Sequence, residues 1–165
     1  MKKIFLVILT FVLFTGIAFS QISLNIGVGP TVLFPSGDFG NAYNTGYGGV
    51  VQGEVGVLSI SGIATIGYLS FSGKDNNPTL SNIPVLVGAK YKLSMGLYAK
   101  AQIGFNNFSA SSYSVTKFGY LAGVGLDLII LDVSAQFQNL GSYNTIKSSV
   151  ATNTISITAL YKFGL

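Results

Sequence analysis

Apolar and polar side chains alternate along most of the chain after residue 20, and the closing segment 153–165, NTISITALYKFGL, shows this most plainly. Successive side chains of a β-strand point to opposite faces, so Ile155 and Ile157 share one face while Thr158 and Lys162 share the other. A soluble barrel turns its apolar face inward, whereas a membrane barrel turns it outward to lipid and lines its lumen with the polar face. This segment alone leaves both orientations open.

The same period of two predicts eight strands, with boundaries uncertain by about two to four residues. The predicted strands are roughly 22–34, 46–57, 60–71, 82–93, 97–107, 117–129, 131–139 and 151–163. The third strand is ambiguous because both of its faces are apolar. Ile66 and Tyr68 lie on one face, and Leu69 and Phe71 lie on the other.

The connections between these strands differ in length and composition. Four are long, polar and rich in turn residues, around Asp38–Thr45, Lys74–Leu80, Ser109–Thr116 and Ser142–Ser149. The other three, near residues 58–59, 94–96 and 129–130, are tight turns, so long and short connections alternate. In outer-membrane barrels the long loops face outside and the short turns face the periplasm, which predicts that both termini are periplasmic.

The composition indicates what surrounds the barrel. Only 8% of the residues are charged and 49% are hydrophobic, whereas an ordinary soluble domain is about 25% charged. No stretch of about 18 or more apolar residues follows residue 20, which excludes helical membrane spans. Because a bilayer tolerates no unpaired sheet edge, we predict an all-β fold, an eight-stranded antiparallel up-and-down transmembrane β-barrel.

The aromatic residues on the outward faces divide by height. Phe34, Tyr47, Phe105, Tyr120 and Phe137 fall at the loop end of their strands, whereas Tyr91, Tyr161 and Phe163 fall at the turn end. Two aromatic girdles that flank an aliphatic band are typical of membrane barrels, and a soluble barrel has no reason to sort aromatics in this way. The pattern favours lipid outside and a polar lumen.

Almost every charged residue of the strands falls on the inward faces. The predicted lumen charge network comprises Glu54, Lys90, Lys92, Lys100, Asp127, Asp132 and Lys162. Eight strands leave an interior just wide enough for side chains to fill, so these charges are expected to pair with one another and plug the barrel. A path for protons or ions is the alternative use of such a cluster.

The N-terminal segment has the features of an export signal. Two lysines precede an apolar run from Ile4 to Phe14, and small residues lie before Gln21. This pattern predicts a cleaved signal peptide at residues 1–20 and a barrel domain at residues 21–165, with an uncleaved membrane anchor as the alternative. With no cysteine in the chain, no disulfide and no lipid on an N-terminal cysteine are expected.

The sequence offers little for catalysis or for binding nucleic acid. It contains no histidine and no cysteine, which removes Ser-His-Asp and Cys-His arrangements and the usual zinc sites, and it has no phosphate-binding loop. Its 9 basic residues are all lysines and form no long basic run that would follow a phosphate backbone. We therefore predict no catalytic, metal or cofactor-binding residues and no nucleic-acid partner.

Several segments resemble a known family. PSGDFGNAYNTGYGG (35–49), IPVLVGAKYKL (83–93), LYAKAQIGF (97–105) and ITALYKF (157–163) are similar to the small, porin-like outer-membrane β-barrels with OmpA-type and OmpX-type relatives. The resemblance implies the outer membrane of a double-membrane bacterium and insertion by the barrel-assembly machinery, with Tyr161 and Phe163 read as the assembly signal. Barrel lipases and deacylases of similar size depend on histidine, so their activity does not carry over.

These features predict a non-enzymatic outer-membrane barrel with a side-chain-filled lumen, structural or adhesive through its extracellular loops. The expected partners are outer-membrane lipid, the assembly machinery and an unidentified molecule bound by the loops. Two alternatives stay open. One is a soluble secreted barrel that binds a small ligand, and the other is a minor small-solute channel.

Overall fold

The computed structural model describes residues 22–75, 77–110, 113–144 and 149–164 of the 165-residue chain. Its elements are β1 (Ile22–Ser36), α2 (Asp38–Ala42), β2 (Tyr43–Val57), β3 (Ile60–Gly73), β4 (Leu80–Lys92), β5 (Leu97–Ala110), β6 (Tyr113–Asp127), β7 (Leu131–Asn144) and β8 (Ser149–Gly164). The signal peptide predicted at residues 1–20 lies outside the described residues. No helix among the described residues is long and apolar enough to cross a membrane.

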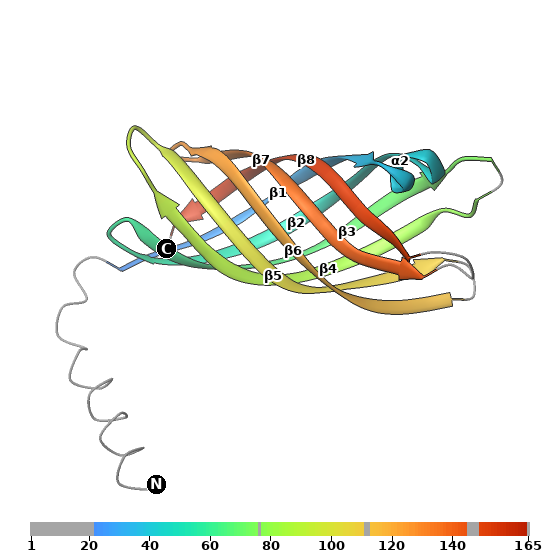
Figure 1. Cartoon of the computed structure of the whole chain (residues 1–165). Helices are drawn as coiled ribbons and strands as arrows, with labels where there is room; N and C mark the ends of the chain where they lie inside the picture. Colours follow the sequence, from blue (N-terminus) through green and yellow to red (C-terminus); the bar gives the residue numbers. More distant parts are fainter. Residues whose placement is uncertain (1–21, 76, 111–112, 145–148, 165) are drawn as a thin grey trace, which may run out of the picture.

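The strands form one closed barrel, in which each strand pairs antiparallel with the next and β1 pairs with β8 (Figure 1). The closing pair runs from Asn25 opposite Gly164 to Ser36 opposite Asn153. The predicted eight-stranded antiparallel barrel is confirmed. The connections after β2, β4 and β6 lie at one end, hereafter the turn end, and α2 lies at the other, hereafter the loop end.

Two of the three short reversals at the turn end use left-handed backbone. Val57 and Ile60 pair across the first turn, and Leu58 between them has a φ of 57°. At the next turn Met95 has a φ of 54° and Gly96 a φ of 82°. Such reversals match the right-handed twist of the strands they join, so these short connections hold neighbouring strands in register.

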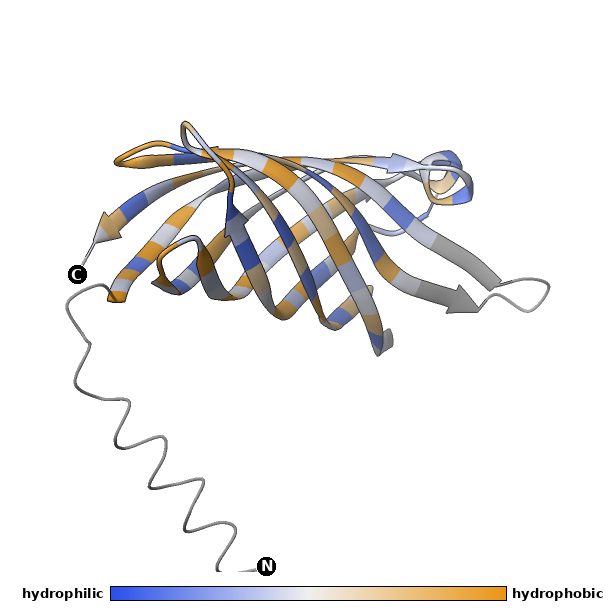
Figure 2. Ribbon diagram, turned by 60° about the vertical axis from the view of Figure 1, so that its left-hand side comes forward, coloured by the Kyte–Doolittle hydropathy of each residue, from blue (hydrophilic) through white to orange (hydrophobic). Residues whose placement is uncertain are grey.

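The alternation of the sequence becomes an alternation between the lumen and the outer surface (Figure 2). On β3, where both faces are apolar, Leu69 and Phe71 are buried while Ile66 and Tyr68 are exposed. This orientation depends on Gly46, the β2 partner of Phe71. Any larger residue there would clash, since its Cβ atom would lie 2.5 Å from the Phe71 ring. A glycine at this position leaves the room that an inward Phe71 needs.

An apolar cluster fills the lumen at the loop end. Its buried members are Leu33, Phe39, Leu69, Phe71, Leu80, Phe108 and Leu140. Phe39 comes from α2, and its ring centroid lies 5.2 Å from that of Phe71. The expectation of a polar lumen does not hold at this end, because the inward faces of β1, β3, β4, β5 and β7 carry apolar residues near the loops. We call this group the apolar plug.

The strands run further at the loop end than the sequence predicts. β5 ends at Ala110 and β6 begins at Tyr113, so the predicted long loop Ser109–Thr116 lies almost entirely in strands. The loop was predicted because this segment is rich in residues that favour turns. The Asn107 and Ser114 side chains bond across the β5–β6 hairpin at 3.2 Å, so polar residues that also favour turns stabilise paired strands instead.

Two other predicted loops are also partly regular. Residues Asp38–Thr45 contain α2 and the start of β2, and residues Ser142–Ser149 include the end of β7 and the first residue of β8. The strict alternation of long and short connections is therefore wrong, since only residues 111–112 separate β5 from β6.

Candidate functional site: the barrel lumen

Lys90 on β4 lies at the centre of a buried cluster of charges near the turn end. Its Nζ atom donates hydrogen bonds to Glu54 at 3.0 Å, Asp127 at 3.0 Å and Asp132 at 2.8 Å, and its side chain is 0% exposed. These carboxylates come from β2, β6 and β7. Inward alternation on four strands thus brings four distant residues together, and we call this group the Lys90 cluster.

Two further lysines complete the charge balance toward the turn end. Lys92 Nζ lies 3.5 Å from a Glu54 oxygen and 3.2 Å from an Asp127 oxygen, and Lys162 Nζ donates to Asp127. Lys92 is 35% exposed, so this part of the cluster reaches the mouth of the barrel. Together with Lys90, these lysines place three ammonium groups against three carboxylates. Each carboxylate has an opposite charge within 4 Å, which offsets the cost of burial.

Tyr98 on β5 is part of the cluster and was not predicted from the sequence. Its hydroxyl donates to Asp132, and the Lys90 Nζ lies 4.2 Å from the centre of its ring, within reach of a cation–π interaction. Gly125 faces Tyr98 across the β5–β6 pair, and a Cβ atom there would lie 2.5 Å from the Tyr98 ring. The sequence signal was present: Tyr98 alternates in phase with the inward Lys100, two residues later.

The carboxylates of the cluster have the spacing of a cation site. Oxygen atoms of Glu54, Asp127 and Asp132 all lie within 4.8 Å of one another. Three carboxylates at this spacing suit a hard divalent cation. The Lys90 ammonium lies among them, and this positive group cannot coordinate a metal ion and repels one. The arrangement therefore serves as an internal salt-bridge cluster.

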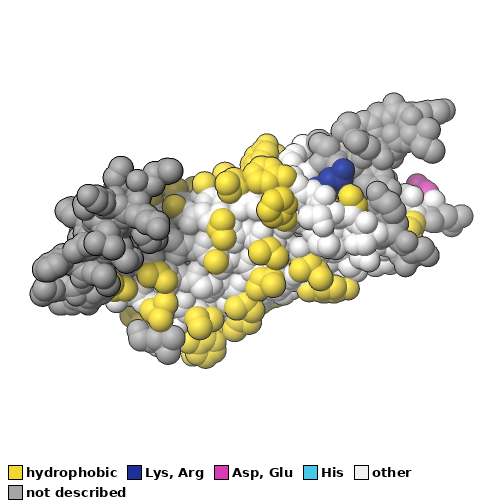
Figure 3. Space-filling model, turned by 90° about the horizontal axis from the view of Figure 1, so that it is seen from below, with side chains coloured by type: hydrophobic (Ala, Val, Ile, Leu, Met, Phe, Trp, Pro, Cys, Tyr) yellow, Lys and Arg dark blue, Asp and Glu magenta, His cyan; other side chains and the backbone are white. Residues whose placement is uncertain are grey.

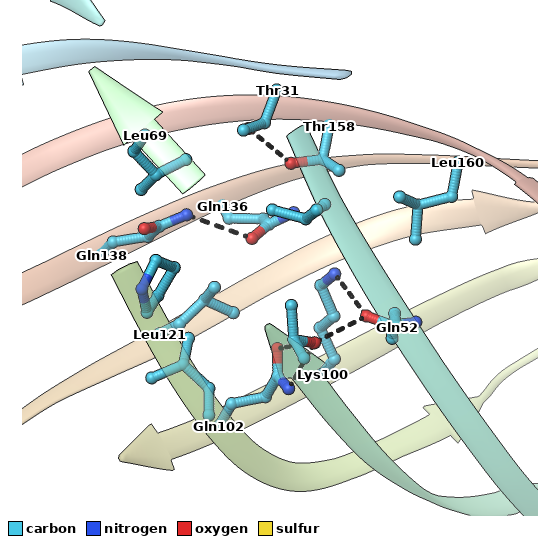
Figure 4. A pocket seen from close by; sticks show the side chains of 14 residues that line it. Thr31, Gln52, Leu69, Lys100, Gln102, Leu121, Gln136, Gln138, Thr158 and Leu160 are labelled. Atoms are coloured by element: carbon cyan, nitrogen blue, oxygen red, sulfur yellow. Dashed lines mark hydrogen bonds between the residues drawn. The ribbon is translucent and has the colours of Figure 1, made fainter. Parts of the chain in front are cut away.

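A layer of amides and hydroxyls fills the middle of the lumen between the Lys90 cluster and the apolar plug (Figure 4). Gln102 Nε2 donates to Thr65 at 2.9 Å, and Gln138 Nε2 donates to Ser156 at 2.8 Å. Lys100, predicted as part of the charge network, also lines this layer, and no carboxylate among the described residues lies within 4 Å of its Nζ atom. Its described hydrogen bond is to Gln52 Oε1, at 3.5 Å.

The eight aromatic residues predicted as girdles all lie on the outer surface. Phe34, Tyr47, Phe105, Tyr120, Phe137, Tyr91, Tyr161 and Phe163 are between 41% and 63% exposed. At the loop end Tyr120 and Phe137 are neighbours, with ring centroids 6.4 Å apart, and at the turn end Tyr161 and Phe163 are 4.8 Å apart. Figure 3 shows apolar side chains across one outer face, and the charged side chains visible in this view lie at its loop end.

No family model and no curated protein matches the sequence. Among solved structures, the chain is similar to Neisserial surface protein A, with a TM-score of 0.60 and 16% identity over 87% of this chain and 100% of that chain. It is also similar to the attachment invasion locus protein Ail of Yersinia pestis, with a TM-score of 0.53 and 14% identity over 87% of this chain and 98% of that chain. The backbone structure of Ail in a phospholipid bilayer nanodisc gives a TM-score of 0.57 at 14% identity, over 86% and 99% of the two chains.

These similarities confirm the predicted resemblance at the level of the fold. The chain has the architecture of the small outer-membrane β-barrels, with eight antiparallel strands closed on themselves.

Lys90→Met should be the most damaging single change in the Lys90 cluster. It leaves Glu54, Asp127 and Asp132 close together without their central cation, which we expect to lower the unfolding free energy by about 3–5 kcal/mol. Lys92→Met removes a partly exposed lysine from the same cluster and should cost about 1 kcal/mol or less. Urea titration of the barrel refolded in lipid vesicles measures both. Adding Glu54→Gln to Lys90→Met should recover part of the loss, and equal midpoints for the two lysine variants would contradict the central role of Lys90.

The filled lumen should not conduct. The apolar plug, the amide layer and the Lys90 cluster occupy successive levels of the barrel, so we expect no stable open state for the wild-type protein in planar lipid bilayers. A variant with Phe71→Ala, Leu69→Ala and Phe108→Ala tests the plug at the loop end. Its ion leakage should rise only if the amide layer and the Lys90 cluster open as well. Stable large openings of the wild-type barrel would contradict a lumen filled by side chains.

Proposed function

We propose that this protein is a non-enzymatic outer-membrane barrel whose role is structural, adhesive or both, with its termini in the periplasm and its loop end outside the cell. The observation that carries this proposal is the separation of surfaces: an apolar outer wall, a lumen occupied by its own side chains, and polar side chains exposed at the loop end. Any specific contact with another molecule then falls to the loop end.

The outer wall has the height of a membrane band. Phe105 follows Leu97 by eight positions along β5, which is roughly 21 Å along the barrel axis at about 3.4 Å per residue and a tilt of about 40°. This approaches the apolar band of about 25 Å in outer-membrane barrels. The aromatic residues at both ends of this band support its placement between the two membrane interfaces.

The orientation follows from the same band. β1 begins and β8 ends at the turn end, where Tyr161 and Phe163 lie on the last strand. Short connections at this end match the periplasmic side of outer-membrane barrels. The barrel-assembly machinery would then meet the Tyr161 and Phe163 side chains on the last strand during insertion.

The loop end provides the surface for adhesion. Strands β5 and β6 continue toward the loop end beyond the paired Phe105 and Phe118. Outward side chains in this part are polar, and Asn107 forms hydrogen bonds with Thr116 and Ser114 at 3.2 Å each. Asp38 and Asp75 are exposed at the same end. Polar groups of this kind bind partners adaptably. Ail, whose structure is similar, is the attachment invasion locus protein of Yersinia pestis, and its structure has been solved in complex with the heparin analogue sucrose octasulfate.

A soluble ligand-binding barrel gains no support. Such a protein needs its apolar face inside and its charges outside, whereas Lys90 and Asp132 are buried and Ile103 and Val124 are exposed. Catalysis gains none either, because the chain has no histidine or cysteine and its lumen carboxylates are held by lysines.

Ile103→Lys places a charge in the middle of the proposed band and should lower the free energy of folding into vesicles by about 2–4 kcal/mol. Ser109→Lys is the matched control, since Ser109 lies on the same outward face of β5 but above the aromatic residues, and it should cost about 0–1 kcal/mol. Urea titrations of the vesicle-refolded proteins give both values. Equal losses at the two positions would contradict lipid contact at Ile103.

Adhesion is tested by removing the polar groups of the loop end while keeping α2, because Phe39 belongs to the apolar plug. The variant changes Asp75 to asparagine and Asn107, Ser109, Ser114 and Thr116 to alanine. It keeps Lys74, whose backbone N–H and Nζ donate to Ala42 and Gly40 of α2. Bacteria that produce the wild-type barrel should attach to cultured epithelial cells, and those that produce the variant should fall to the level of cells with an empty vector.

The control for this test changes Ser59 and Ser94 to alanine at the turn end, and should attach as the wild type does. Heat-modifiable migration on gels verifies that each variant is folded. Full attachment by the loop-end variant would refute adhesion through this surface and leave a structural role.

A further inference from the structure

Lys100 carries a positive charge that the rest of the described lumen does not balance. The three carboxylates of the Lys90 cluster are matched by Lys90, Lys92 and Lys162. Lys100 is 6% exposed, and no carboxylate among the described residues lies within 4 Å of its Nζ atom. The described inward face therefore holds one surplus buried cation at mid-height.

The described hydrogen bonding of Lys100 is also incomplete. An ammonium group has three N–H donors, and the described contact of this one is the 3.5 Å bond to Gln52 Oε1, at the limit of hydrogen-bond length. A buried ammonium that lacks partners is unfavourable by several kcal/mol. Lys100 thus needs a further acceptor, and the other side chains that line the space beside it are neutral.

A cavity lies beside this ammonium. Its volume is about 20 Å³, and its lining includes Gln52, Gln102, Gln136, Thr158 and Lys100. Figure 4 shows the Lys100 side chain directed among these residues, with its bond to Gln52. A cavity of roughly 10–15 Å³ by this measure already holds one water-sized particle, so there is room for a single small occupant.

We propose that this cavity is a binding site for one small monovalent anion of about the size of chloride, held by the Lys100 ammonium. The single charge matches the one surplus lysine. The cavity is too small for sulfate, phosphate or a carboxylate, and the positive charge of the ammonium repels cations. Amide and hydroxyl groups of the lining complete the shell. The anion binds as the barrel closes and stabilises the folded state, because the unfolded chain offers no such site.

The experiment compares the wild-type barrel with Lys100→Met, which keeps the length of the side chain and removes its charge. Lys117→Met is the control, since it removes one charge from the loop end of β6, outside the cavity. Each protein is refolded into zwitterionic vesicles in sodium chloride, sodium bromide or sodium gluconate at equal ionic strength. The measured quantity is the urea concentration at the midpoint of unfolding.

The wild type and Lys117→Met should unfold at higher urea in chloride and bromide than in gluconate, and Lys100→Met should have the same midpoint in all three salts. A wild-type midpoint that does not depend on the anion would overturn the proposal. So would an anion dependence that persists in Lys100→Met.

Anomalous diffraction from wild-type crystals grown in bromide provides a measurement that needs no variant. We expect a bromide peak within hydrogen-bond reach of Lys100 Nζ. Water alone at that position, or a cavity without bromide, would refute the site even if Lys100→Met fails to fold.

Discussion

Closure of the sheet between β1 and β8 is the constraint on which the rest of the structure depends. A backbone group that faces hydrocarbon has no water to bond, so a sheet in a bilayer has to close on itself. Eight strands enclose a lumen that side chains alone can fill, and each inward residue must fit the residues opposite it. Gly125 illustrates this requirement, because any side chain there would enter the space of the Tyr98 ring.

The narrow lumen arranges its side chains in layers. Charges gather at the turn end around Lys90, amides and hydroxyls fill the middle, and the apolar plug closes the loop end. Each layer satisfies its members in a different way: by ion pairs, by hydrogen bonds or by contact between apolar groups. Lys100 fits this scheme least well, since its charge lies in a layer of neutral groups. Two buried oxygen atoms, Asn82 Oδ1 and Thr154 Oγ1, also have no hydrogen-bond partner among the described residues.

The same separation supports the proposal that contact with other molecules falls to one end of the barrel. Side chains of the outer wall, such as Ile103 and Val124, suit lipid, and those of the lumen bond to one another. Polar groups that are committed to neither task lie where β5 and β6 extend beyond Phe105. A barrel of this kind can change its partner through these residues while its wall and lumen stay the same.

The sequence by itself determined the number of strands, their antiparallel order and the face on which Lys90 or Phe105 lies, because a period of two is a local property of the chain. It also marked the residues that could form a charge cluster. Tertiary structure decided which of them meet, since Glu54, Lys90 and Asp132 lie on β2, β4 and β7, and their heights depend on the registers of all the strands between them. For the same reason local periodicity could not separate Lys100 from the cluster, place Phe39 inside the plug or extend β5 and β6 past the predicted loop. Those features arise from contacts across the lumen and between strands, and such contacts exist only once the barrel has closed.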